Sequence, residues 1–125
     1  MVAKIVKGKS FKGVVNYILD KAKQTELLAA EGVRHKSRES IIRSFIAQTG
    51  LNPKVSKTVG HISLSFSAQD REKLTNAKVI QIAKDYMEKM GIANTQYIIG
   101  RHHDREHPHI HIVFNRIDNN GRTIW

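Results

Sequence analysis

Histidines are concentrated near the end of this chain, where five of its seven histidines fall within the ten positions 102–111. If residues 109–115 form a β-strand, alternate side chains point to opposite faces, so His109 and His111 share one face with Val113 and Asn115. The Cα atoms of the two histidines would then lie roughly 6 to 7 Å apart, a separation from which both imidazoles can reach one cation. This spacing predicts a metal site on the polar face of the strand.

A third imidazole is expected from the preceding strand of a hairpin. Residues 97–100 read as a strand and residues 104–108 as the loop that follows, which brings His102 beside His109. Three neutral imidazoles leave coordination positions open on a divalent metal, as catalytic sites do, and the chain has no cysteine that would close the shell. We therefore predict a catalytic site for a divalent cation, with magnesium, manganese and zinc all open as its identity.

The other elements are predicted from hydrophobic spacing and capping residues. Strands are expected at residues 2–7 and 61–66, the latter with one apolar and one polar face, and a hairpin turn at 119–121. Helices are expected after the caps Ser10 and Ser37, in a patch over residues 25–31, and most clearly at about 76–90. The pattern predicts one α/β domain over residues 1–125. It is a two-layer sandwich in which helices cover one face of a mainly antiparallel sheet and the metal site lies on the other.

The charge balance of the chain points to a polyanionic partner. The formal net charge is +10, with 21 Lys and Arg against 11 acidic residues, so nucleic acid is the leading candidate. A basic membrane-surface protein is the competing interpretation, but the basic residues are scattered over every segment rather than along one amphipathic helix. No apolar run resembles a signal peptide or a membrane span, and cysteine is absent, so we expect a cytoplasmic protein without membrane contact.

A metal on a sheet face surrounded by positive charge suits a phosphodiester substrate. The cation can polarise phosphate oxygens while basic residues hold the flanking backbone. Because the chain has no cysteine, the nucleophile is expected to be water, a serine or a tyrosine. Tyr17 lies off the apolar stripe of its predicted helix, whereas Tyr86 lies within the stripe of its own, so packing is the role expected of Tyr86.

Three motifs resemble those of the HUH endonucleases, and within that superfamily the mobilisation relaxases of the MobA/VirD2-like or MobP type. Residues 11–18 (FKGVVNYI) resemble the nucleophile motif and residues 61–66 (HISLSF) the second motif. Residues 102–104 (HHD) with 107–116 (HPHIHIVFNR) resemble the third, which is the most specific of the three. The resemblance spans nearly the whole chain.

This resemblance implies a site- and strand-specific DNA endonuclease. Tyr17 would attack a scissile phosphate of single-stranded DNA at a plasmid or mobile-element transfer origin during conjugative mobilisation. The products would be a 5′-phosphotyrosine link and a free 3′-hydroxyl. His102, His109 and His111 would hold the divalent metal. The implied partners, besides the DNA, are relaxosome accessory proteins and a coupling protein.

Further residues are assigned to the same site. Asp104 is expected either to act as a base or to orient a ligand imidazole, and we favour the second role. The resemblance implies that Ser65 binds DNA near the cut. Four more residues within or beside the motifs are taken as DNA contacts: Ser63, His107, Asn115 and Arg116.

Two other functions stay open on the sequence. A rolling-circle replication initiator of the same superfamily carries its tyrosine after the histidine motif, and no tyrosine follows His111. A non-enzymatic single-strand-binding module, whose metal only pins a hairpin, would favour aromatic stacking platforms, yet only 6% of the residues are aromatic. The chain also stops at Trp125 inside a predicted strand, where relaxase domains continue with further helices, so we expect an N-terminal fragment of a longer protein.

Overall fold

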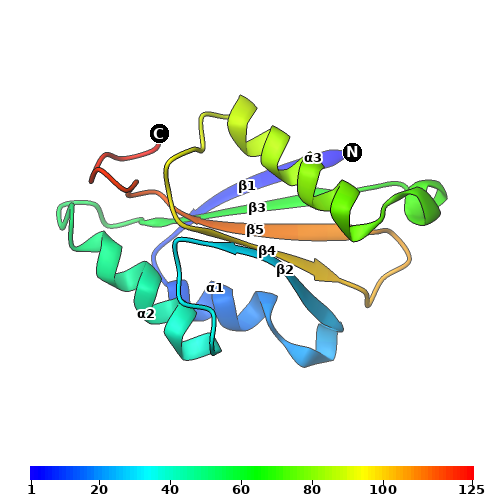
Figure 1. Ribbon diagram of the computed structural model, residues 1–125, viewed down its shortest axis with the longest axis horizontal. Coiled ribbons are helices and arrows are strands. Elements are labelled where there is room, and N and C mark those ends of the chain that lie inside the picture. Colours follow the sequence, from blue (N-terminus) through cyan, green and yellow to red (C-terminus); the bar gives the residue numbers. More distant parts are fainter.

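Five strands form one antiparallel sheet at the centre of the computed structural model, which describes residues 1–125 (Figure 1). They are β1 (Val2–Gly8), β2 (Thr25–Glu31), β3 (Val59–Ser65), β4 (Tyr97–His102) and β5 (His109–Asn115). Their order across the sheet is β1-β3-β5-β4-β2, and each neighbouring pair is antiparallel. The histidine strand β5 therefore lies in the middle, with β3 on one side and β4 on the other.

Helices pack on both faces of this sheet. The helix α3 (Asn76–Lys89) covers one face, and α1 (Phe11–Ile18) and α2 (Arg38–Thr49) lie against the opposite face (Figure 1). Two short 3-10 helices, η1 (Lys21–Lys23) and η2 (Ala68–Lys73), follow α1 and β3. The predicted α/β class with an antiparallel central sheet is confirmed. The fold differs in one respect, because the helices are not all on one face.

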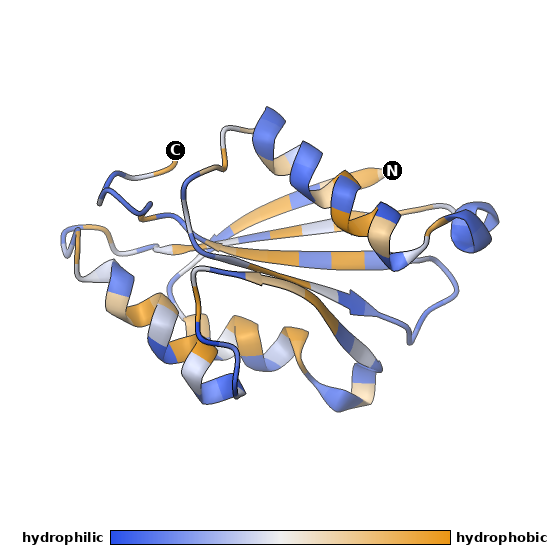
Figure 2. Cartoon of the chain, viewed as in Figure 1, coloured by the Kyte–Doolittle hydropathy of each residue, from blue (hydrophilic) through white to orange (hydrophobic).

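Two apolar clusters account for this arrangement. On the α3 side, the inward strand residues pack with the buried face of the helix: Ile62, Leu64, Ile110, Ile112 and Phe114 with Val79, Ala83 and Met87. On the other side, a smaller set of strand residues packs with α1 and α2: Val59, Ile98 and Val113 with Phe11, Val15, Ile18, Ile41 and Phe45. The helices turn their hydrophobic residues toward the sheet (Figure 2).

The face that carries the histidines is therefore divided into two halves. Along β5 the same face presents His109 and His111 and then Val113, whose side chain is fully buried under the helices. The apolar end of the face packs against the apolar stripes of α1 and α2, while the histidine end meets only the last turn of α1. The alternation along the strand predicts a polar face that is free of helices, but Val113 makes one end of that face apolar.

Residues 25–31 form the edge strand β2, where a helical patch was predicted. Their sequence, TELLAAE, is rich in strong helix formers. Antiparallel pairing with β4, from Thr25 opposite His102 to Glu31 opposite Tyr97, overrides that propensity, with one register shift near Leu27. The outcome depended on a partner strand about seventy residues away in the chain, which local propensity cannot report.

Several local predictions are confirmed. The Ser10 side chain accepts a hydrogen bond from the Gly13 amide, and the Ser37 side chain accepts one from the Ser40 amide, as helix caps do. The turn at residues 119–121 brings Thr123 back to pair with Ile117. None of the helices has both the length and the apolar character needed to cross a bilayer.

A glycine holds the last turn of α1 close to the sheet. A Cβ atom at Gly100 would lie 2.8 Å from Cγ2 of Ile18, so a residue without a side chain admits this approach. The Ile18 carbonyl then accepts hydrogen bonds from Thr25 Oγ1 and from His102, both at 2.8 Å. The last residue of α1, Ile18, is therefore bonded to His102. Tyr17, the residue before Ile18, lies next to the histidines as a result.

Candidate metal centre

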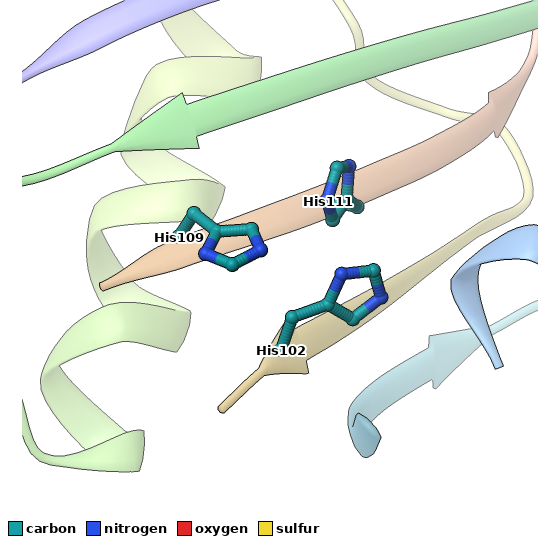
Figure 3. Close-up of side chains that lie close together, drawn as sticks. All are labelled: His102, His109 and His111. Atoms are coloured by element: carbon teal, nitrogen blue, oxygen red, sulfur yellow. The ribbon is translucent and has the colours of Figure 1, made fainter. Parts of the chain in front are cut away.

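Three histidines from the neighbouring strands β4 and β5 converge on one point of the sheet. They lie at the end of the face that α2 does not cover, which we call the open half-face. The pleat of β5 puts His109 and His111 on the same side, and His102 of β4 lies directly opposite His109 in the register. All three side chains are buried, and one ring nitrogen of each lies within 4.8 Å of the others. Figure 3 shows the three rings gathered over β4 and β5. The predicted ligand set is therefore brought together.

Hydrogen bonds hold two of the rings by the nitrogen that does not face the cluster. His102 donates from Nε2 to the Ile18 carbonyl at 2.8 Å, and His109 donates from Nδ1 to the His107 carbonyl at 3.2 Å. A carbonyl oxygen only accepts, so each of these ring nitrogens must carry the proton. The lone pair of the neutral ring is then on the other nitrogen, Nδ1 of His102 and Nε2 of His109.

The third ring, His111, has one engaged nitrogen and one that is buried alone. Its Nδ1 lies 2.9 Å from Nε2 of His61, while its Nε2 is buried without any hydrogen-bond partner. A buried polar atom without a partner is costly and uncommon in a folded protein. A divalent cation held jointly by His102, His109 and His111 would satisfy this nitrogen, so the residues fit the predicted metal.

Burial favours the neutral form of His111, His102 and His61, and the neutral form of imidazole is the one that binds metals. It lowers the pKa of His111 to about 3, with the neighbouring His102, His61 and His109 rings and Arg105 contributing in that order. The pKa values of His102 and His61 are also lowered, in both cases chiefly by burial. Protons therefore compete weakly with a cation for His111.

Asp104 lies on the Nε2 side of the His109 ring. Its Oδ1 is 3.6 Å from His109 Nε2, which is beyond hydrogen-bond length and on the nitrogen that carries the lone pair. The predicted role of orienting a ligand imidazole therefore belongs to the carbonyl of His107, which holds His109 at Nδ1. The Asp104 carboxylate instead borders the space in front of the three rings.

Tyr17 stands beside the histidine cluster. The residue is 42% exposed, and the centroid of its ring lies 5.8 Å from that of His111 and 6.0 Å from that of His102, with steep interplanar angles. The Lys23 ammonium lies 4.9 Å from the centroid of the tyrosine ring, which places a positive charge next to it. An exposed hydroxyl-bearing ring next to three predicted metal ligands and a lysine has the chemistry to attack a phosphate.

An open cavity of about 720 Å³ lies over this cluster. It is lined by Tyr17 and Lys23 from the α1–β2 region, the three predicted ligands, two strand serines, and the loop after β4. The full lining is Met1, Val2, Tyr17, Lys23, Ser63, Ser65, Phe66, Ser67, His102, Asp104, Arg105, His107, His109 and His111.

The chain matches one known family model over most of its length. Residues 17–125 match the model of the family described as Relaxase: MobA/VirD2-like, nuclease domain. The chain belongs to this relaxase family. A search of curated proteins found no match to it. Membership makes the chain a DNA-nicking nuclease domain that acts on single-stranded DNA, and a divalent metal is the cofactor used by such relaxases.

The relaxase domain keeps three of the predicted DNA-contact residues at its cavity. Ser63 and Ser65 are half-buried on β3, and His107 is exposed in the loop before β5. Tyr86, in contrast, lies far along the sequence on α3 and packs half-buried against the core on the opposite face, as predicted. Only Tyr17 of these two tyrosines adjoins the histidines.

Two predicted DNA contacts are corrected, because their polar groups serve the fold. Asn115 is fully buried, with Nδ2 donating to the Phe45 carbonyl and to Gln96, and its Oδ1 accepting from the Ile117 amide. Arg116 is also buried and donates to backbone carbonyls near the end of the chain, including that of Ile124. Asn115 ends β5 beneath α2, and Arg116 follows it in the chain, so neither lies at the histidine end of the face.

Three residues of the site are missing from the sequence prediction. Lys23 and Arg105 line the cavity, and His61, which the sequence places only in the second motif, has its ring against that of His111. The alternation of side chains along residues 61–66 predicts that His61 shares a face with Ser63 and Ser65. The missing information was the sheet order, which sets β3 next to β5.

Proposed function

We propose that this relaxase domain nicks one DNA strand at the transfer origin of a plasmid or mobile element, with Tyr17 as its nucleophile. The position of Tyr17 carries the proposal, since its exposed ring stands 5.8 Å from His111, across the same cavity as the three predicted ligands. A net charge of +10 favours the polyanionic strand. Relaxosome accessory proteins, a coupling protein and a cytoplasmic setting belong to this proposal.

The proposed step is a transesterification. The phenolic oxygen of Tyr17 forms a bond to the scissile phosphorus, and the bond from phosphorus to the 3′ oxygen breaks. The departing oxygen takes up a proton to become a 3′-hydroxyl, and the tyrosine proton passes to a base, for which Asp104 at the cavity rim is our candidate. The phosphotyrosine ester retains the energy of the broken bond, so the 3′-hydroxyl can later reverse the step.

The cavity residues have distinct parts in this reaction. A divalent cation held by His102, His109 and His111 would polarise the non-bridging oxygens of the scissile phosphate. Lys23 and Arg105 line the cavity and would neutralise the flanking phosphates. Histidine-only ligation favours softer transition metals, whereas magnesium is the cation generally available for phosphate chemistry, so we leave manganese, zinc and magnesium as candidates.

A covalent adduct tests the proposal. The chain is incubated with Mn²⁺ and a pool of 3′-labelled single-stranded oligonucleotides that tile the replicon carrying its gene. On a denaturing gel, a 5′-phosphotyrosine link transfers the label to the protein. Tyr17→Phe should abolish the labelled band, and excess chelator should do the same. Tyr86→Phe removes the same hydroxyl group from the opposite face and should leave the band unchanged.

The possible results separate the alternatives. A band that persists in Tyr17→Phe and disappears in Tyr86→Phe would show that the nucleophile is on the other helix. Cleavage without any labelled protein would show that water, and not tyrosine, attacks. Strand binding without cleavage in any metal would support a non-enzymatic single-strand-binding module.

A further inference from the structure

His61 is placed to control a metal ligand without being one. It lies on β3 opposite Val113, one step along the face from Ser63, which pairs with His111. Diagonal neighbours on adjacent strands are within reach of long or aromatic side chains. The rings of His61 and His111 have centroids 5.1 Å apart, and His61 Nε2 lies 2.9 Å from His111 Nδ1.

This nitrogen-to-nitrogen contact can hold its proton in only one of two ways. If His111 donates from Nδ1, the lone pair of its neutral ring is on Nε2, the buried atom that has no hydrogen-bond partner in the protein. If His61 donates instead, the proton of His111 lies on Nε2. That buried nitrogen then has a proton without an acceptor and cannot bind a cation. The first arrangement is the one that a metal site requires.

The other two ligands show what this contact does. His102 and His109 each place the nitrogen that faces away from the cluster against a backbone carbonyl, which can only accept. No backbone acceptor is paired with His111, and the Nε2 atom of His61 takes that place. Each of the three rings is therefore held by one acceptor, and only the acceptor of His111 is a side chain.

We propose that His61 is a positioning residue that fixes the ring orientation and the tautomer of His111, and so sets the affinity of the centre for its cation. The proposal rests on the proposed function in one respect, that His111 is a metal ligand. It does not depend on Tyr17 or on cleavage. Acceptors that hold metal-bound histidines commonly change metal affinity about 10- to 100-fold when removed.

Calorimetric titration of the full chain with Mn²⁺, in the absence of DNA, tests this role. His61→Leu fills a similar space without an acceptor and should weaken Mn²⁺ binding by about 10- to 100-fold. His61→Gln offers a side-chain oxygen to His111 Nδ1 and should recover part of the loss. His35→Leu changes an exposed histidine away from the cluster and should bind Mn²⁺ like the unaltered chain.

A double-mutant cycle separates positioning from a general structural effect. In a His111→Ala background, His61→Leu should cause no further loss of Mn²⁺ affinity, because its partner ring is already gone. Thermal unfolding without metal identifies a variant that fails to fold, in which case His61→Gln alone carries the comparison with His35→Leu. Unchanged Mn²⁺ affinity in a folded His61→Leu, or an equal loss in both backgrounds, would overturn the proposal.

The two proposals can fail separately. If the unaltered chain forms no adduct but His61→Leu still weakens Mn²⁺ binding through His111, the nicking function fails and the positioning role stands. If the adduct forms and His61→Leu binds Mn²⁺ as tightly as the unaltered chain, the positioning role fails and the nicking function stands.

Discussion

Gly100→Ala should push α1, which carries the proposed nucleophile Tyr17, away from the three-histidine cluster. The added methyl carbon would lie 2.8 Å from Cγ2 of Ile18. Carbon atoms in favourable contact are about 3.5 to 4.0 Å apart, so the two must separate by about 0.7 Å or more. Ile18 is fully buried in the α1–α2 cluster and has no room to turn outward. The last turn of α1, with Tyr17, must therefore move.

Gly100→Ala is expected to lower both the stability of the fold and the rate of adduct formation. Overpacking of a closed core typically costs about 1 to 3 kcal/mol, which unfolding in urea would report as a lower midpoint. A misplacement of a reacting group by about 1 Å can slow a reaction by about 10²-fold, so labelled adduct should form more slowly by up to that factor. Mn²⁺ affinity should fall less, because only His102 touches the displaced carbonyl.

Matched variants distinguish this reason from a general effect of alanine in the sheet. Gly8→Ala adds a methyl group at ordinary contact distance, 3.7 Å from Val59, and should be nearly neutral. Ile18→Ala removes Cγ2, so the double variant with Gly100→Ala should lose less than the sum of the two single losses. If Gly100→Ala forms adduct as fast as Gly8→Ala and is equally stable, the close approach at Gly100 does not position α1.

Three further predictions test the corrected sites and the electrostatics. Asn115→Ala should lower the free energy of unfolding by on the order of 3 kcal/mol, because the Phe45 carbonyl and the Ile117 amide lose a buried partner. If the folded variant instead binds DNA more weakly, Asn115 contacts DNA as the sequence predicts. Binding of single-stranded DNA, followed by fluorescence anisotropy, should weaken steeply between about 50 and 200 mM salt, and a flat response would contradict a charge-driven interaction. The pKa of His111 is about 3 when folded, and a free histidine has one near 6.5, so between these values the unfolded chain binds more protons. The metal-free chain should accordingly have a lower urea midpoint at pH 5 than at pH 7, and a midpoint that rises toward pH 5 would contradict the buried neutral ring.

The predictions that failed share a physical origin. The TELLAAE segment of β2 has helix-forming residues, and only pairing with β4 makes it a strand. Asn115 shares a face with His109 and His111, and only the packing of α2 over that end of the face makes it a structural residue. In both cases the deciding partner comes from another part of the chain, so no window of neighbouring residues contains the information.

What the sequence determined by itself was local: which residues share a face. Alternation along residues 109–115 puts His109 and His111 on one side, and helical spacing sets Tyr17 off its apolar stripe, because both follow from backbone geometry between near neighbours. Tertiary structure decided which faces meet. His61 and His111 are 50 residues apart in the chain, and Ile18 and His102 are 84 apart. These contacts depend on β5 lying between β3 and β4 and on α1 docking against Gly100, which are set by the burial of the whole core and not by any local pattern.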